Sequence, residues 1–202
     1  MVDEFSAFAR MPKPILSPLD IRIPLREASF LIDVSRPEMT IEKSLPEGPL
    51  FGLFDNRMIG QAIGNLIKNA TEAIDGRDEG QNSEPGHVLV KATANNGLIV
   101  VDIIDNGKGL PRENRQRLLE PYMTTREKGT GLGLAIVRKI VEEHSGIMSL
   151  HDAPKSFHDG VGANIRLEFP AINTATSAIE IEPNHPTKIN LINENRTVAN
   201  GI

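Results

Sequence analysis

The sequence predicts an α+β fold of two layers, in which helices cover one face of a mixed, mostly antiparallel sheet. Short apolar segments bounded by turn residues come in pairs along the chain. Two longer segments have apolar residues at intervals of three and four, and an Asn-Gly dipeptide separates two strand-like segments. A chain of 202 residues with 39% hydrophobic residues is long enough to bury one such core.

The first half of the chain begins with apolar residues at helical spacing, which Pro12 and Pro14 end. A short helix is expected over 24–35, and short strands over 38–45 and 49–55. The strongest helical pattern runs from Asn56 to Asp75, where eight apolar residues follow one face of the helix. A polar, glycine-containing loop ends it.

The second half continues with two strands over 87–95 and 98–105, which the Asn-Gly turn joins into a hairpin. A short charged helix is expected at 111–120, and a longer helix from near Gly131 to His144. Two more strands complete the globular part, at 146–152 and 162–170. Residues 171–202 have no aromatic residue and no long amphipathic stripe, so we expect a weakly structured extension.

Composition excludes several classes of function. The net charge of -5 gives no general electrostatic reason to expect nucleic acid as a partner. The absence of cysteine excludes disulfides, thiolate catalysis and cysteine-ligated metals, and suits a reducing cytoplasm. The sequence contains no secretory leader and no apolar run of 18 or more residues, so we expect a chain that is soluble as given.

Three alternating glycines, Gly129, Gly131 and Gly133, stand at the start of the last predicted helix. The phosphate-loop pattern GxxxxGK[ST] is absent from the chain, and the spacing differs from the dinucleotide pattern GxGxxG. The physical basis of both patterns remains, because glycines let the backbone approach a phosphate and a helix start offers unpaired N–H groups. We therefore predict an anion site here.

A second motif, DNGKG, follows the apolar strand LIVVDII and contains Asp105, Gly107 and Gly109. An aspartate in this place can accept a hydrogen bond from an exocyclic amine, and the glycines let a flat ring lie against the backbone. A tight turn without a ligand explains this motif equally well when it is taken alone.

A third motif lies on the long helix, where Asn65 and Asn69 are four residues apart and share one face. Apolar residues surround both amides in the sequence, so we expect them to be at least half-buried and to need polar partners.

Taken together, these motifs resemble those of a known family. In chain order, N-x-x-x-N-A, D-x-G-x-G and G-T-G-L-G-L, with EPYMTTREK before the last, resemble the boxes of the ATP-binding domain of sensor histidine kinases, in the GHKL superfamily. The resemblance extends from about residue 39 to 169. The N-terminal MVDEFSAFARMPKP resembles the end of the dimerisation hairpin in nitrogen-regulation kinases of the NtrB/NtrY type.

The resemblance implies a Bergerat α/β sandwich with ATP and Mg²⁺ as ligands. It assigns the adenine amino group to Asp105, the adjoining wall to Gly107 and Gly109, and Mg²⁺ to Asn69, with Asn65 in the same catalytic site. It assigns the phosphate oxygens to Thr130, Gly131, Leu132 and Gly133. Three basic residues are weaker phosphate candidates, and for each of them a solvated surface charge is the favoured interpretation: Lys68, Arg126 and Lys128. Tyr122 and Met123 stand where the family has apolar aromatic residues.

Histidine kinases phosphorylate a histidine followed by a characteristic motif, and none of the five histidines here has that context. The resemblance thus implies a truncated kinase with three parts: residues 1–14 as the end of a dimerisation helix, 15–170 as the ATP-binding domain and 171–202 as the extension. The implied partners are ATP or ADP, an upstream phosphoacceptor domain and a response regulator. The implied setting is the cytoplasmic part of a homodimeric kinase with a possible membrane anchor.

Two alternatives stay open. ATP-hydrolysing members of the same superfamily have a glutamate one helical turn before the magnesium asparagine, where this chain has Asn65, so no carboxylate is placed to activate water. Glu72 is a possible substitute, with a surface charge as the simpler interpretation. The second alternative is a nucleotide-sensing interaction module without catalysis.

Overall fold

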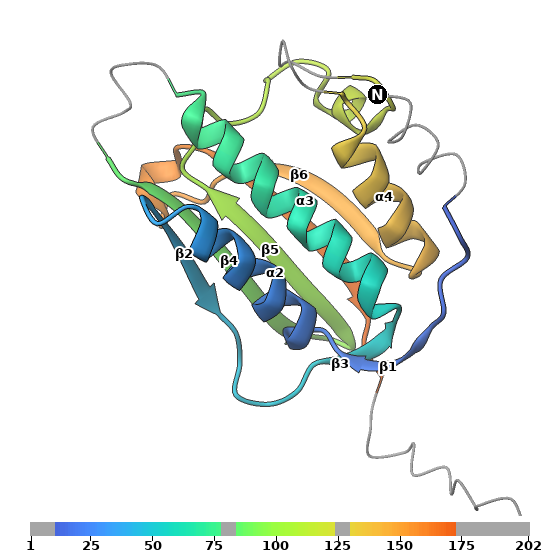
Figure 1. The fold of residues 1–202 in the computed structure, drawn as a ribbon. Coiled ribbons are helices and arrows are strands. Elements are labelled where there is room, and N and C mark those ends of the chain that lie inside the picture. The colour runs from blue at the N-terminus through green and yellow to red at the C-terminus, as the bar shows by residue number, and fades with distance from the viewer. Residues whose placement is uncertain (1–10, 78–83, 124–129, 173–202) are drawn as a thin grey trace, which may run out of the picture.

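The computed structural model describes residues 11–77, 84–123 and 130–172. A five-stranded sheet forms one layer and helices form the other, on one face of the sheet (Figure 1). The strand order is β2-β4-β5-β7-β6, in which only the β2–β4 pair is parallel among the described strands. The strands are β2 (Met39–Ser44), β4 (Gly86–Asn95), β5 (Leu98–Asp105), β6 (Ile147–Asp152) and β7 (Ala163–Pro170). This architecture confirms the predicted fold class.

Three helices lie side by side over the sheet, with α3 (Asn56–Asp75) between α2 (Arg22–Ser35) and α4 (Gly133–Glu143) (Figure 1). The apolar stripe of α3 is buried as its spacing predicts, and Ile59, Ile63, Leu66 and Ile67 are at most 1% exposed. Alternate residues of β4 and β5 face these side chains and complete the core. The central helix is therefore enclosed by the sheet beneath it and by a helix on each side.

The hairpin of β4 and β5 has the predicted Asn-Gly turn. Asn96 and Gly97 both have positive φ, 49° and 76°, as a two-residue hairpin loop of this type requires. The pairing runs from Asn95 opposite Leu98 to Val88 opposite Asp105, so the hairpin register sets Asp105 at the end of the sheet.

Three expectations from the sequence differ from the structure. A short strand that the sequence analysis missed, β1 (Ser17–Asp20), pairs antiparallel with β3 (Phe51–Phe54) in a separate two-stranded sheet. The charged helix expected at 111–120 is a single 3₁₀ turn, η1 (Arg115–Leu119), which starts after Asn114 at φ 53°. The helix expected over 24–35 begins earlier, at Arg22. A second 3₁₀ turn, η2 (His158–Gly160), precedes β7.

Predictions for residues 1–10 and 173–202 lie outside the described residues, so the proposed boundaries at 14/15 and 170/171 stay predictions.

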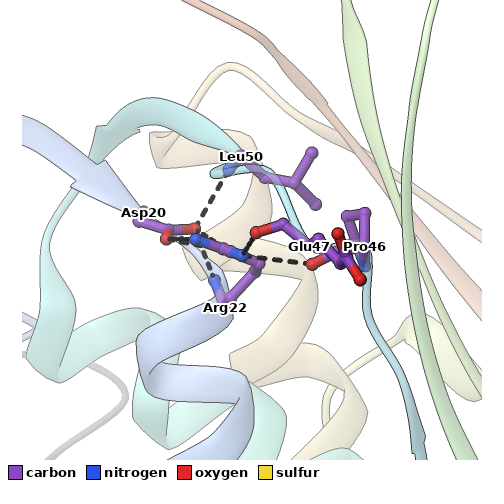
Figure 2. A network of polar contacts seen from close by, with 5 residues as sticks. All are labelled: Asp20, Arg22, Pro46, Glu47 and Leu50. Carbon is purple, nitrogen blue, oxygen red and sulfur yellow. Dashed lines mark hydrogen bonds and ion pairs between the residues drawn. The ribbon is translucent and has the colours of Figure 1, made fainter.

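An ion pair fixes the chain where β1 passes into α2 (Figure 2). The Asp20 carboxylate accepts hydrogen bonds from the Arg22 guanidinium, at 2.6 Å for the shortest, and from the backbone N–H of Leu50 at 3.1 Å. Arg22 also donates to the carbonyls of Pro46 and Glu47, at 3.1 and 2.6 Å. The pair thereby holds the loop between β2 and β3 against the start of α2.

We predict that Asp20 stabilises the fold in a pH-dependent manner. Burial alone would raise the pKa of its carboxyl, but the hydrogen bonds from Arg22 and Leu50 hold it below the ordinary 3.8. The stabilisation is therefore present above about pH 4 and is lost as the pH falls through the folded-state pKa. At pH 7, Asp20→Asn should lower the unfolding free energy measured in urea by about 1–3 kcal/mol. If Asp20→Asn lowers the unfolding free energy by the same amount at pH 2.5 as at pH 7, the pH-dependent role of Asp20 is wrong.

Candidate functional site

A cavity of about 340 Å³ lies between α3, the turn after β5 and the start of α4. Nine of the ten site residues predicted from the sequence line it: Asn65, Lys68, Asn69, Asp105, Gly109, Thr130, Gly131, Leu132 and Gly133. The three motifs are far apart in the sequence, and the fold brings them together. A more open groove of about 600 Å³ lies on the outer side of α4 and has none of these residues in its walls.

The tenth residue, Gly107, is not among the residues that line the cavity. It lies behind Asp105 and donates its backbone N–H to Oδ1 of that carboxylate at 2.8 Å. A Cβ at this position would approach the backbone of Ala73 to 2.6 Å, so the turn packs directly on α3. Arg126 and Lys128 lie outside the described residues.

Asp105 is a buried carboxylate, 4% exposed, at the last position of β5. The next residue, Asn106, anchors the turn: its Oδ1 accepts from His87 N at 2.8 Å and its Nδ2 donates to the Pro85 carbonyl at 3.0 Å. Sequence analysis missed this anchor, because both bonds reach back across the hairpin to the start of β4. The carboxylate is thus held in one orientation on a rigid element.

Asn65 and Asn69 lie on successive turns of α3, and both are half-buried as predicted. A Cβ on Gly133 would lie 3.6 and 3.7 Å from the two amide atoms of Asn69, so this amide faces the first turn of α4. The neutral amide therefore lies beside the positive end of the α4 dipole.

The start of α4 has the features of an anion site. Its N-cap residue, Leu132, makes no side-chain capping bond, and Gly131 just before it has φ +68°, a conformation that residues with a side chain rarely adopt. The Gly131 carbonyl accepts a hydrogen bond from the N–H of Tyr122 at 3.0 Å, which joins the two ends of the segment 123–130. A helix start with uncapped N–H groups beside a cavity can bind phosphate oxygens.

The charged residues that line the cavity are Asp105, Glu72, Lys68 and Lys108. The ammonium of Lys68 lies 3.9 Å from the carboxylate of Glu72, and its side chain is 68% exposed. Among the described residues, no group of three or more histidines, aspartates or glutamates could hold a metal ion by itself. A metal ion here would need oxygen ligands from a bound molecule as well as from an amide.

The sequence analysis missed the apolar surface of the cavity. Ile103 precedes Asp105 by two positions in β5, and Ala163 and Ile165 come from the adjacent strand β7. Leu118 and Ile136 contribute from η1 and α4. The alternation of side chains along the strands could have predicted this surface, because Ile103 and Asp105 are two residues apart and share a face of the sheet. A flat, apolar ring can pack on this surface while its polar edge reaches Asp105.

Comparison with known proteins gives a consistent result. The family model described as histidine kinase-, DNA gyrase B- and HSP90-like ATPase matches residues 54–173. The chain is 50% identical over 171 residues to the nitrogen regulation protein NtrY of Azorhizobium caulinodans, covering 85% of this chain and 21% of that protein. It is 36% identical to a putative sensor histidine kinase NtrY-like of Rickettsia felis, covering 74% of this chain and 24% of that protein. The chain therefore spans between a fifth and a quarter of the length of these relatives.

Solved structures share the fold. Full-length ShkA in complex with AMPPNP matches with a TM-score of 0.66 at 27% identity, covering 84% of this chain and 35% of that one. The mycobacterial sensor histidine kinase MprB matches with a TM-score of 0.65 at 24% identity, covering 78% and 98%.

We predict that Gly131 and Gly133 respond differently to alanine. A Cβ on Gly131 would lie 2.5 Å from backbone atoms of Tyr122 and would adopt an unfavourable φ, so Gly131→Ala should lower the unfolding free energy by about 1–3 kcal/mol. A Cβ on Gly133 meets only ordinary contacts, so Gly133→Ala should change it by less than about 1 kcal/mol. Urea denaturation measures both, and equal losses would refute the role of the Gly131 backbone.

Proposed function

Because the chain belongs to the family of histidine kinase-, DNA gyrase B- and HSP90-like ATPases, we propose that its cavity binds ATP with Mg²⁺ and presents the γ-phosphoryl group to a histidine of an upstream dimerisation domain. The chain is the ATP-binding domain of a sensor histidine kinase of the NtrY kind. One observation carries the proposal: the buried Asp105, the Asn65–Asn69 pair and the uncapped start of α4 line one cavity.

The adenine ring would lie at the Asp105 end of the cavity. The carboxylate accepts a hydrogen bond from the exocyclic amino group, and Ile103 and Ile165 provide an apolar surface for the ring. Guanine has a carbonyl at the corresponding position, which would face the carboxylate oxygen with no proton between them. The site should therefore select adenine over guanine.

The triphosphate would lie toward the start of α4. The N–H groups of Gly133 and Leu134 and the chain from Thr130 are placed to donate to phosphate oxygens. Lys68 offers a further positive charge, and its exposure fits a group that meets the outer phosphates.

Mg²⁺ would be held by the amide oxygen of Asn69 together with phosphate oxygens and water. These residues fit the ion, since magnesium is a hard cation that commonly takes only one or two protein oxygens in nucleotide sites. When bound, it neutralises phosphate charge during transfer. Asn65 lines the same cavity.

Transfer is favoured over hydrolysis by the residue at position 65. A rapid ATPase needs a carboxylate there to accept the proton of water, and an amide has no such basicity. In phosphotransfer the acceptor imidazole is itself the nucleophile, so no base is required at that point of α3. Mixing this chain with a histidine-bearing hairpin of the full-length protein and radiolabelled ATP would test transfer. A nucleotide-sensing module would bind ATP and leave the hairpin unlabelled.

The proposed partners are the upstream dimerisation domain in a homodimer and a response regulator that receives the phosphoryl group. We also propose that the domain is the cytoplasmic part of a membrane-anchored kinase. Among the described residues, no helix is long and apolar enough to cross a membrane.

We predict that Asp105→Asn weakens binding of ADP and of a non-hydrolysable ATP analogue by about 10- to 100-fold, because a buried charge-assisted hydrogen bond is lost. Isothermal titration calorimetry measures the affinity, with GTP as the ligand control and circular dichroism to confirm the fold. Gln61→Ala, an exposed position on α3, is the control variant. Unchanged affinity in folded Asp105→Asn would remove the adenine assignment.

We predict that Asn69→Ala removes most of the difference between affinities with and without Mg²⁺. The wild-type chain should bind the ATP analogue about tenfold more tightly with Mg²⁺ than in EDTA, since the ion links the amide to the phosphates. Titrations of both proteins in both buffers give the comparison. A magnesium effect of the same size in both would show that Asn69 is not the ligand.

A further inference from the structure

Asp55, between β3 and α3, is bonded to three separate parts of the fold. Its Oδ1 caps α3 by accepting from the backbone N–H groups of Arg57 and Met58, at 3.1 and 3.2 Å. Its Oδ2 accepts from the N–H of Ile15, 40 residues away, at 3.0 Å. Its own N–H donates to Nε2 of His144 at 3.0 Å. The residue is 7% exposed, so water competes little for these bonds.

His144 completes the connection to α4. It is the C-cap residue of that helix and is 3% exposed. Its Nδ1 donates to the Ile140 carbonyl at 2.7 Å, which leaves Nε2 as the acceptor for Asp55 N–H. The imidazole therefore joins the end of α4 to the beginning of α3.

The same two helices also meet at the nucleotide site, where Asn69 of α3 faces Gly133 of α4. The distance along α3 from Asp55 to Asn69 is about 21 Å, and the distance along α4 from His144 to Gly133 is about 16 Å, at 1.5 Å per residue. The helices are hydrogen-bonded at one end and lie close together at the other. A change in their relative position at the Asp55 end would therefore reach the spacing of the phosphate-binding groups at the other end.

Ile15 belongs to the segment through which the chain enters this domain. The segment continues into β1, where Ser17 lies opposite Phe54, and it is fixed again at Asp20 by the bond to Leu50 (Figure 2). The Ile15 side chain is 79% exposed, so the backbone N–H is its principal contact with the domain. Met11, in the same segment, packs against the core, and the bond to Asp55 Oδ2 fixes the backbone of the segment at Ile15.

We propose that Asp55 is a positioning residue that makes nucleotide affinity depend on docking of the segment at Ile15, by linking that segment to both α3 and α4. The inference rests on the proposed ATP site. The segment at Ile15 raises nucleotide affinity if it docks more tightly to the arrangement of α3 and α4 that binds nucleotide than to other arrangements. By thermodynamic linkage, bound nucleotide then strengthens docking of the segment by the same factor. An upstream domain that pulls on the segment would therefore change occupancy of the site without touching it.

The electrostatic setting of Asp55 agrees with this geometry. The hydrogen bond from Ile15 N–H is the largest influence that lowers the pKa of the carboxyl, and it outweighs the opposite effect of burial. The hydrogen bonds from Met58 and Arg57 N–H lower it further, as does the Arg57 guanidinium, which lies 3.7 Å from Oδ2 and is 68% exposed. Loss of the Ile15 bond should thus move the pKa up toward its ordinary value.

The test uses Ile15→Pro, which removes the N–H, with Ile15→Ala as the matched control that keeps it. In the whole chain, Ile15→Pro should weaken binding of ADP and of the ATP analogue about fivefold, near the lower end of known coupling effects. Ile15→Ala should bind as the wild type does. A carboxyl NMR titration should show a higher pKa for Asp55 in the proline variant only. Calorimetry well below the unfolding temperature separates this effect from a loss of stability.

Asp55→Asn provides a second, independent variant. Asparagine caps a helix as well as aspartate does, but its single oxygen cannot serve both α3 and Ile15. The nucleotide affinity of Asp55→Asn should fall by a similar factor, and adding Ile15→Pro to this variant should lower the affinity no further. Equal affinities of wild type and Ile15→Pro, or additive losses in the double variant, would overturn the inference. A wild-type chain that binds no nucleotide would instead overturn the proposed function.

Discussion

The packing of α3 against α4 over one face of the sheet is the constraint on which the rest of the structure depends. The sheet, α2 and α4 cover most of the surface of α3, and Ile63, Leu66 and Ile67 are fully buried as a result. Asn65 and Asn69 lie on the strip that faces the cavity, where α4 begins. Because interiors are closely packed, any shift of either helix costs packing contacts. The helix start that can hold phosphate is therefore kept beside the amides that can hold a metal ion.

Much of this arrangement could be predicted from the sequence, because its signals are local. The bounds of α3 and β5 match their predictions, since a long apolar stripe marks the helix and an Asn-Gly turn marks the start of the strand. The features that were missed depend on distant contacts: β1 acquires its partner from β3, and Asp55 meets His144 across 89 residues. The helix expected at 111–120 was wrong for another reason: its charged residues suit a solvated helix and a loop almost equally, so the sequence pattern does not distinguish them.

The charges of the cavity set the orientation of a nucleotide. The buried carboxylate of Asp105 repels phosphate and suits an amino group, while the positive end of the α4 dipole attracts phosphate. The apolar surface of Ile103 and Ile165 belongs to the Asp105 end. One orientation satisfies all three preferences, and the reversed one opposes each of them. Rigid anchoring of the turn by Asn106 makes this preference a property of the fold.

The same geometry suits a domain that holds ATP until an acceptor arrives. Asn65 and Asn69 are amides, which position charge and do not activate water, and the Glu72 carboxylate that also lines the cavity is paired with Lys68. Under the proposed function, bound ATP can then persist, and the rate of phosphotransfer depends on delivery of an imidazole and on how fully the site is occupied. Docking at Asp55 acts on that second quantity, because it fixes the helix pair from the end opposite the nucleotide. A signal that moves the upstream chain can in this way control both the approach of the acceptor and the readiness of the donor.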